Sequence, residues 1–124
     1  MPLVERDLSY LVDIFDCVED VIAYTANISI HDFEQDKMRR LAVERQLEVI
    51  GQAANGVSKS GQDQLTQIPW SQMIGLRNKL AHDYGDILAK RIWDIARLSI
   101  PELKFELLTI PEVLEYSKAK TSNI

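Results

Sequence analysis

Eight consecutive residues carry the most unusual chemistry of the chain: Arg77-Asn78-Lys79-Leu80-Ala81-His82-Asp83-Tyr84. On a helical wheel of about 100° per residue, Arg77 falls in the middle of an apolar arc. The apolar side chains of this arc are Trp70, Met73, Ile74, Leu76, Leu80, Ala81 and Tyr84. A guanidinium at that position needs a carboxylate, a water-filled cleft or a bound anion, because an unpaired buried charge costs several kcal/mol.

The spacing of the polar side chains limits what one copy of the chain could do. Arg77 and His82 lie about 140° apart on an ideal helix, with a rise of about 7.5 Å between them, so they do not point at one spot. Asn78 and His82 share a face at i, i+4, and Tyr84 shares the stripe of Arg77. One copy therefore arranges these groups poorly, whereas two copies facing each other across a cleft would surround a bound anion.

These residue types suit the cleavage of RNA by its own 2′-hydroxyl. The reaction needs a base for the hydroxyl proton, an acid for the leaving 5′-oxygen, and cations for the charge of the phosphorane. Histidine titrates near neutrality, and arginine offers phosphate a planar, permanently charged fork. The other histidine, His31, lies in a predicted loop without neighbours of catalytic type. The acid–base pair would then be His82 from each of two subunits, or one His82 together with another group.

A purely structural interpretation also explains the segment. Arg77 could be paired with a glutamate in the core, and His82 could cap the end of its helix. Glu44 and Glu48 lie one turn apart on the preceding predicted helix, and one of them could pair with Arg45 or with Arg77.

Metal chemistry is not indicated by the pattern of side chains. The sequence has no His-x-x-x-His pair, no paired cysteines and no carboxylate–histidine cluster with the spacing of metal ligands. Asp83 and Asp86 are close to His82 but fit roles at the end of a helix. There is also no glycine-rich phosphate loop and no nucleophile elbow. We therefore expect neither a metal nor another cofactor.

Hydrophobic periodicity predicts the elements that must position this segment. Nearly every stretch repeats its apolar residues with a period of about 3.6, which is typical of an all-α up-and-down bundle, here of four or five helices. The predicted helices are one with a stripe from Leu8 to Ile22, one capped by Asp36 that reaches Val57, one with Pro69 in its first turn, one from near Asp86 and one near Pro101. The wide apolar faces of the first and third indicate a dimer.

The breaks between these helices are predicted from turn residues and prolines. Residues 27–32 are expected to form a turn and residues 58–67 the longest connection. Residues 99–102 fit either the start of a new helix or a kinked continuation, and Pro111 predicts a further break. Residues 118–124 are expected to be a frayed tail.

Length and composition indicate one domain, residues 1–124, in a reducing cytoplasm. The single cysteine, Cys17, cannot form an internal bridge. No signal peptide is recognisable and no window approaches the roughly 18 apolar residues that span a bilayer, so we expect no membrane partner. The formal net charge of −5 argues against a protein that coats nucleic acid, but leaves room for an enzyme with a local basic cleft.

The run from Arg77 to Tyr84 resembles the Arg-x4-His signature of the HEPN superfamily, in the Arg-x4-His-x-Tyr form of its HepT-type toxin branch. Other segments are similar to that family's second helix, its approach to the motif and its C-terminal helices, namely residues 45–54, 68–75, 92–95 and 100–103. The similarity covers about residues 5–110. Arg-x4-His alone is a weak signal, whereas this ordered set is a strong one.

The resemblance implies a helical bundle that forms a homodimer through the face bearing the motif and acts on RNA as a metal-independent ribonuclease toxin. Arg77 and His82 would be catalytic, and Asn78, Lys79 and Glu48 would support them or bind the substrate. Pairing of dimers into a larger assembly stays open.

Tyr84 matches the tyrosine that, in HepT-type toxins, is adenylylated by a nucleotidyltransferase antitoxin of the MntA type. The resemblance therefore implies such an antitoxin as a partner. AMP on Tyr84 would add negative charge and bulk on the helical stripe of Arg77, and would compete with the RNA phosphate.

One residue departs from the family pattern, and other functions remain open. Gln52 stands where many relatives carry an acidic residue, which would leave Glu48 or Glu44 to position Arg77. The first alternative function is a non-catalytic helical module that holds a nucleotide or a partner protein in the same cleft. The second is a purely structural dimerisation module.

Overall fold

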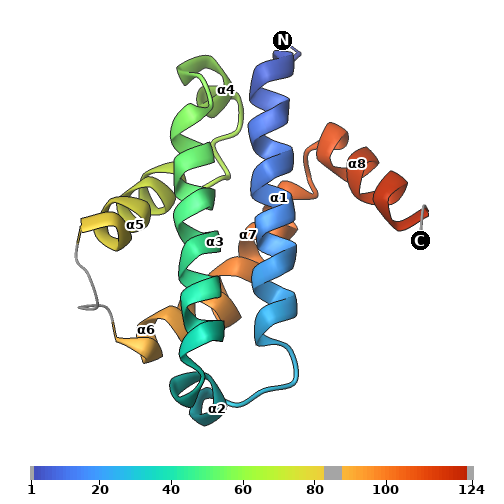
Figure 1. The fold of residues 1–124 in the computed structure, drawn as a ribbon. Coiled ribbons are helices and arrows are strands. Elements are labelled where there is room, and N and C mark those ends of the chain that lie inside the picture. Colours follow the sequence, from blue (N-terminus) through green and yellow to red (C-terminus); the bar gives the residue numbers. More distant parts are fainter. Residues whose placement is uncertain (1, 83–87, 123–124) are drawn as a thin grey trace.

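The computed structural model describes residues 2–82 and 88–122, and within these ranges it contains helices and loops but no strand (Figure 1). In chain order the elements are α1 (Glu5–Thr25), α2 (Ile30–Gln35), α3 (Lys37–Gly56), α4 (Lys59–Gln64), α5 (Trp70–His82), α6 (Ala89–Asp94), the π-helical turn η1 (Ile95–Ser99), α7 (Ile100–Leu107) and α8 (Pro111–Ser122). The prediction of an all-α bundle is confirmed.

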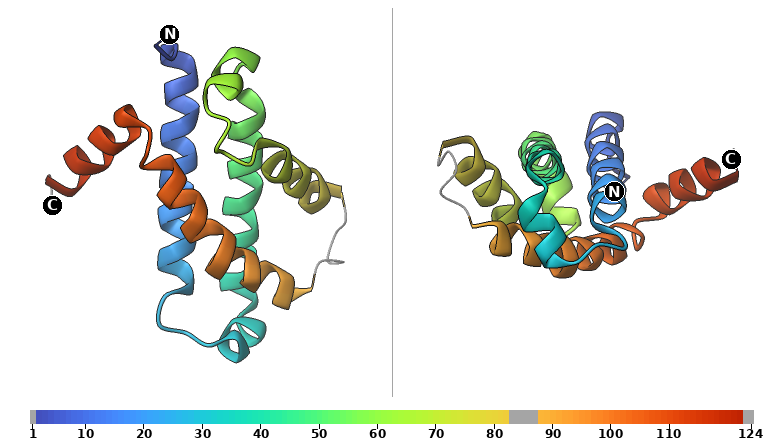
Figure 2. Two further views of the ribbon diagram at one scale, coloured as in Figure 1. Left: turned by 180° about the vertical axis from the view of Figure 1, so that it is seen from behind. Right: turned by 60° about the horizontal axis from the view of Figure 1, so that its bottom comes forward.

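Two long antiparallel helices, α1 and α3, form the centre of the bundle (Figure 1). α5 packs against α3, and the continuous run from α6 through η1 to α7 passes across the back of the pair as drawn in Figure 1, which faces the viewer in the left view of Figure 2. Their apolar stripes meet in one core, and burial of apolar surface at about 25 cal/mol per Å² is its main source of stability. The largest side chains without exposed surface are Leu11, Ile14, Phe15, Phe33, Ile92 and Leu107.

The predicted turn at residues 27–32 is only partly correct, because α2 begins inside it. The Ser29 hydroxyl accepts a hydrogen bond from the backbone N–H of Asp32 at 3.1 Å, and the Asp32 carboxylate accepts one from the Ser29 N–H at 3.2 Å. This reciprocal cap satisfies two donors at the start of a helix of only one and a half turns. Phe33 anchors that helix in the core, 5.3 Å from the ring of Trp93.

The predicted connection at residues 58–67 likewise contains a short helix, α4. The Ser58 hydroxyl accepts from the Gly61 N–H at 3.0 Å, which caps the helix. The Ser58 N–H and hydroxyl both donate to the buried carboxylate of Asp7, at 2.9 and 2.6 Å. Asp7 thereby joins the first turn of α1 to the start of α4, a contact between residues too distant in sequence for a local pattern to reveal.

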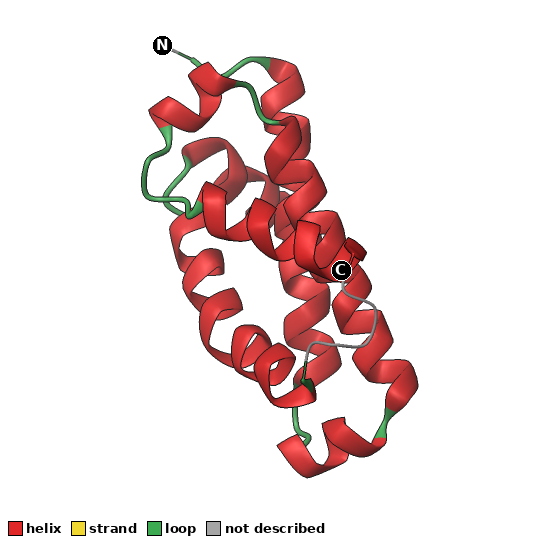
Figure 3. Ribbon diagram, turned by 90° about the vertical axis from the view of Figure 1, so that its left-hand side faces the viewer, coloured by secondary structure: helices red, strands yellow, loops and turns green. Residues whose placement is uncertain are grey.

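Of the two alternatives for residues 99–102, the continuation is formed, because η1 ends at Ser99 and α7 begins at Ile100 with no loop between them. Figure 3 shows the described chain as helices joined by loops. Pro101 has no N–H, and its ring would clash with a carbonyl one turn earlier in a regular helix. The wider turn of η1, in which the Ile100 N–H donates to Ile95, precedes it and accommodates this.

The prediction of a frayed tail from residue 118 is wrong within the described residues, since α8 is helical through Ser122. Its polar side chains hold it to α1: the Tyr116 hydroxyl donates to Asp16 at 2.8 Å, and Lys120 pairs with the same carboxylate at 2.7 Å. α7 ends at Leu107 and α8 begins at Pro111, so the break predicted from Pro111 is formed.

None of the helices in residues 2–82 and 88–122 combines the length and the hydropathy needed to cross a membrane.

The crossing of α3 and α5 is set by Gly51. A Cβ on Gly51 would overlap the Cβ of Arg77 and would lie 2.5 Å from the carbonyl oxygen of Met73. The backbone of α3 therefore touches α5 directly, at the residue that begins the Arg-x4-His motif. Gly75, two residues earlier on α5, is in the opposite situation, because a Cβ there would meet no neighbouring group of the described residues within 4 Å.

We predict that Gly51→Ala lowers the free energy of unfolding by about 1–3 kcal/mol, because the added methyl forces two packed helices apart. Gly75→Ala is the matched control: it is expected to raise the same quantity by about 0.5–1 kcal/mol, since alanine is the better helix former and meets no neighbour. Urea unfolding of the two variants beside the parent measures both effects. Equal midpoints for Gly51→Ala and the parent would contradict a direct contact.

Candidate active site

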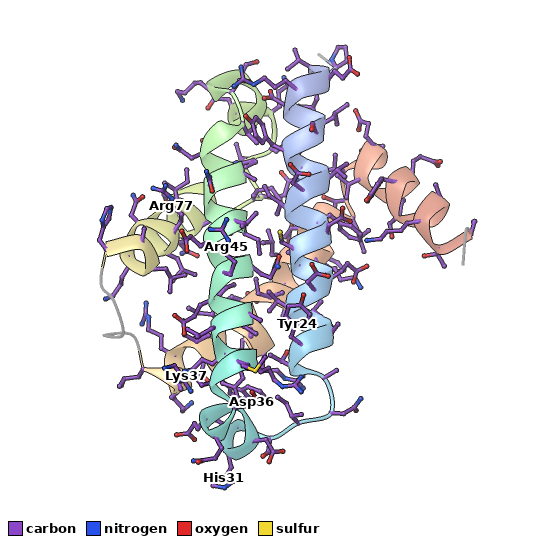
Figure 4. The ribbon with its side chains drawn as sticks, in the orientation of Figure 1. Tyr24, His31, Asp36, Lys37, Arg45 and Arg77 are labelled. Carbon is purple, nitrogen blue, oxygen red and sulfur yellow. The ribbon has the colours of Figure 1, made fainter. Side chains whose placement is uncertain are left out.

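Arg77 lies where α5 meets α3, and its side chain is half-buried (Figure 4). One terminal nitrogen, Nη1, donates to the side-chain oxygen of the neighbouring Asn78 at 3.0 Å. The Nε atom is buried and has no hydrogen-bond partner among the described residues. A buried N–H without a partner is rare in folded proteins and marks a place where a ligand or a second chain could supply an acceptor.

The glutamates of α3 do not neutralise Arg77. Glu48 pairs with Arg45 on its own helix, at 3.4 Å, and no ion pair in the described residues joins Glu44 or Glu48 to Arg77. Of the two pairings that the sequence left open, the one with Arg45 is formed. The interpretation of Arg77 as the buried partner of either glutamate is wrong.

His82, the last residue of α5, has an exposed side chain. Helical geometry directs it about 140° away from Arg77, and no hydrogen bond joins the two residues. Within one copy the structure therefore brings together Arg77 and Asn78, but not Arg77 and His82. Tyr84 and its neighbour Asp83 lie outside the described residues.

Lys79, which the family resemblance placed among the supporting or substrate-binding residues, faces a different part of the molecule from Arg77. It lines a cleft of about 470 Å³ that α5 forms with α3 and with the run from α6 to α7. We call this the α5–α7 cleft. Its apolar wall includes Leu47, Ile50, Met73, Leu76, Ile100 and Leu103. Lys79 is therefore separated from Arg77 by the body of α5.

Glu44 is a partly buried carboxylate near the crossing of α3 and α5, which the sequence motif did not single out. The spacing i, i+4, i+7 places Glu44, Glu48 and Gly51 on one flank of α3, the flank that contacts α5. Burial raises the pKa of Glu44 above its ordinary value, against a smaller opposing effect of Arg40. The signal available in the sequence was this spacing of two acidic residues and a glycine on one helix.

The described residues contain no group of three His, Cys, Asp or Glu side chains that could hold a metal ion. The expectation that the protein needs no metal stays a prediction.

Comparison with known proteins identifies the protein family to which the chain belongs. The family model described as "Ribonuclease HepT-like" matches residues 14–110, which include the whole of α3, α5 and α7. The protein belongs to the HepT-like ribonuclease family. The predicted family is thus confirmed, and with it the prediction that the chain is an enzyme of the ribonuclease class.

Individual relatives span nearly the same length. A protein of Methanocaldococcus jannaschii named "Putative RNase" is 36% identical over 83% of this chain and 95% of its own length. One of Thermococcus cleftensis named "Probable ribonuclease HepT" is 35% identical over 77% of this chain and 86% of its own. A third, from Caldanaerobacter subterraneus and named "Putative RNase", is 32% identical over 88% and 95%. No solved structure gave a significant match.

We predict that Glu44→Gln raises the free energy of unfolding at neutral pH. Because folding raises the pKa of Glu44, the folded state binds this proton more tightly, and stability falls as the pH rises through the ordinary and then the folded pKa. Glutamine removes that loss, whereas below the ordinary value of 4.5 both variants carry a neutral side chain. Urea unfolding at the two pH values measures the difference.

The control for this prediction is Glu115→Gln, because Glu115 is exposed on α8 and its replacement changes the net charge by the same amount. A gain in stability for Glu44→Gln that is equally large in acid would refute the role of burial.

Proposed function

We propose that the protein is a toxin that cleaves RNA internally without a metal ion, in the cytoplasm, and that its site is built from Arg77 and His82. The observation that carries this proposal is the guanidinium of Arg77, which is half-buried and has one buried N–H without a described partner. A phosphodiester supplies the negative charge and the acceptor oxygens that this group lacks. Membership of the HepT-like ribonuclease family supports RNA as the source of that phosphodiester.

The proposed reaction is an in-line attack of the ribose 2′-oxygen on the adjacent phosphorus. A base removes the 2′-hydroxyl proton, the new O–P bond forms, and the bond to the 5′-oxygen breaks as an acid gives that oxygen a proton. The products are a 2′,3′-cyclic phosphate and a 5′-hydroxyl. Arg77 would stabilise the charge that develops on the phosphoryl oxygens, and His82 would move the protons.

The divergence of Arg77 and His82 within one copy supports a site shared by two copies. Because His82 is exposed at the end of α5, it can reach a phosphate held by a second chain without disturbing the packing of its own. In such a homodimer each copy contributes its His82. One of the two histidines would act as the base and the other as the acid. Asn78, bonded to Nη1, would orient the guanidinium.

We predict that Arg77→Ala and His82→Ala each lower the rate of RNA cleavage by about a hundredfold or more, the scale expected for the loss of an oxyanion-stabilising donor or of an acid–base group. The assay is cleavage of a mixed tRNA and mRNA pool by the full chain in EDTA. His31→Ala is the matched control, because His31 is exposed on α2, well away from Arg77 (Figure 4).

Cleavage that survives both substitutions, or that appears only when a divalent metal is added, would overturn this mechanism. RNA binding without turnover, lost in Arg77→Ala and retained in His82→Ala, would instead favour the non-catalytic binding module.

We further propose that a nucleotidyltransferase antitoxin neutralises the toxin through Tyr84. The antitoxin would transfer AMP from ATP to the tyrosine hydroxyl and release pyrophosphate. The added phosphate would lie two residues beyond His82 in sequence, and would compete for the cation that RNA requires.

Tyr84→Phe is predicted to keep cleavage and to escape inhibition by the antitoxin and ATP, since it lacks the acceptor oxygen. Mass spectrometry of the treated parent should locate AMP on Tyr84, and the control variant Tyr24→Phe, changed on α1 (Figure 4), should still be modified and inhibited. Inhibition of Tyr84→Phe as strong as that of the parent would rule out this residue.

A further inference from the structure

The α5–α7 cleft is a second concave site on α5, separate from the face of Arg77. Its volume of about 470 Å³ falls within the range of small-molecule sites. Its wall is formed by side chains of α3, α5 and α7, most of which are buried or half-buried. The apolar interior is large enough to receive a planar group such as a nucleobase.

Gly75 gives the cleft a feature that the fold itself does not require. It lies within α5, where glycine is a poor helix former, and no neighbouring group in residues 2–82 and 88–122 lies within 4 Å of the position that a Cβ would take. At position 51 only glycine fits, because the backbones of two helices touch there. At position 75 no contact within the described structure requires a glycine. Because Gly75 lines the cleft, its missing side chain leaves the backbone of α5 open to an external group.

The polar groups of the cleft suit an anion attached to an apolar plane. Lys79 on α5 and Arg91 on α6 both line it, both are exposed, and neither forms an ion pair within residues 2–82 and 88–122. Gln72 and Ser99 add an amide and a hydroxyl, which can donate and accept hydrogen bonds at the edge of a base. The charge of this cleft is opposite to the net charge of the chain, which is −5.

The cleft and His82 belong to the same side of α5. On an ideal helix Gly75, Lys79 and His82 fall within about 60° of one another, and Lys79 precedes His82 by a rise of about 4.5 Å. A nucleotide with its base beside Gly75 and its phosphate at Lys79 would therefore extend along α5 towards His82.

We propose that the α5–α7 cleft binds one unpaired base of the RNA next to the cleaved phosphodiester, with Lys79 and Arg91 on the neighbouring phosphates and Gln72 and Ser99 at the edge of the base. This subsite rests on the proposed ribonuclease function and deepens it, since it names where substrate preference arises. Proteins recognise single-stranded RNA by receiving splayed bases in such clefts. A side chain from a second copy is the competing occupant.

The test measures binding without turnover. The probes are fluorescein-labelled hexamers of 2′-O-methyl RNA, each of a single base, because methylation removes the attacking hydroxyl. The full chain is expected to bind one composition most tightly. Gly75→Leu, which fills the cleft, should weaken that complex by about tenfold, the scale of one base contact, and remove the preference. Ser71→Leu, on an exposed position of α5 outside the cleft lining, is the matched control and should bind as the parent does.

A second variant keeps the test independent of whether Gly75→Leu folds. Replacing both Lys79 and Arg91 by Gln changes only exposed side chains, and should weaken binding of every hexamer. The slope of log affinity against log salt should fall by about 0.7 for each phosphate contact that is lost.

Three outcomes would overturn the subsite: no base preference in the parent, unchanged affinities in the double variant, or a Gly75→Leu variant that loses dimerisation but keeps the base preference. The last would identify the cleft as an interface between copies. Because the hexamers report binding alone, a protein that shows the cleft-dependent preference but cleaves no RNA would refute the proposed function and leave the subsite standing. A protein that cleaves RNA but shows no cleft-dependent preference would support the proposed function and refute the subsite.

Discussion

The direct contact between the backbone of α3 at Gly51 and the base of the Arg77 side chain is the constraint on which the rest of the structure depends. It draws α5 against α3 closely enough to bury Nε of Arg77 while leaving Nη1 to Asn78. A larger residue at position 51 would move α5 outward, and the guanidinium would then be hydrated like any surface arginine. A ligand that supplies an acceptor to that nitrogen would be stabilised, because an unsatisfied buried donor costs about 1–3 kcal/mol.

The same contact divides the chemistry of α5 between two sides. Arg77 is held on the side that faces α3, whereas Gly75 and Lys79 line the cleft towards α7 and His82 projects from the end. One helix thus presents a guanidinium on one face, lines an apolar cleft with another, and ends in an exposed histidine. Under the proposed function, this division explains why a site that needs both Arg77 and His82 would require two copies of the chain.

The features that could be predicted from the sequence are those that depend on residues close together in the chain. Periodicity within one helix predicted the long helices and the position of Arg77 among apolar side chains, because both depend on neighbours three or four residues away. The short helices after Ser29 and Ser58 were missed, since each depends on one capping side chain and on burial supplied by distant residues. The crossing at Gly51 and the cleft that receives Lys79 depend on which helices meet, and no local pattern states that.

The ends of the RNA fragments would test the central claim most directly. After incubation of the full chain with a short single-stranded RNA in EDTA, mass spectrometry would identify the termini. The account predicts 2′,3′-cyclic phosphate and 5′-hydroxyl ends in the parent, and neither in His82→Ala. Fragments that carry a 3′-hydroxyl and a 5′-phosphate would contradict it, because they require a water molecule, and not the ribose 2′-hydroxyl, as the attacking group.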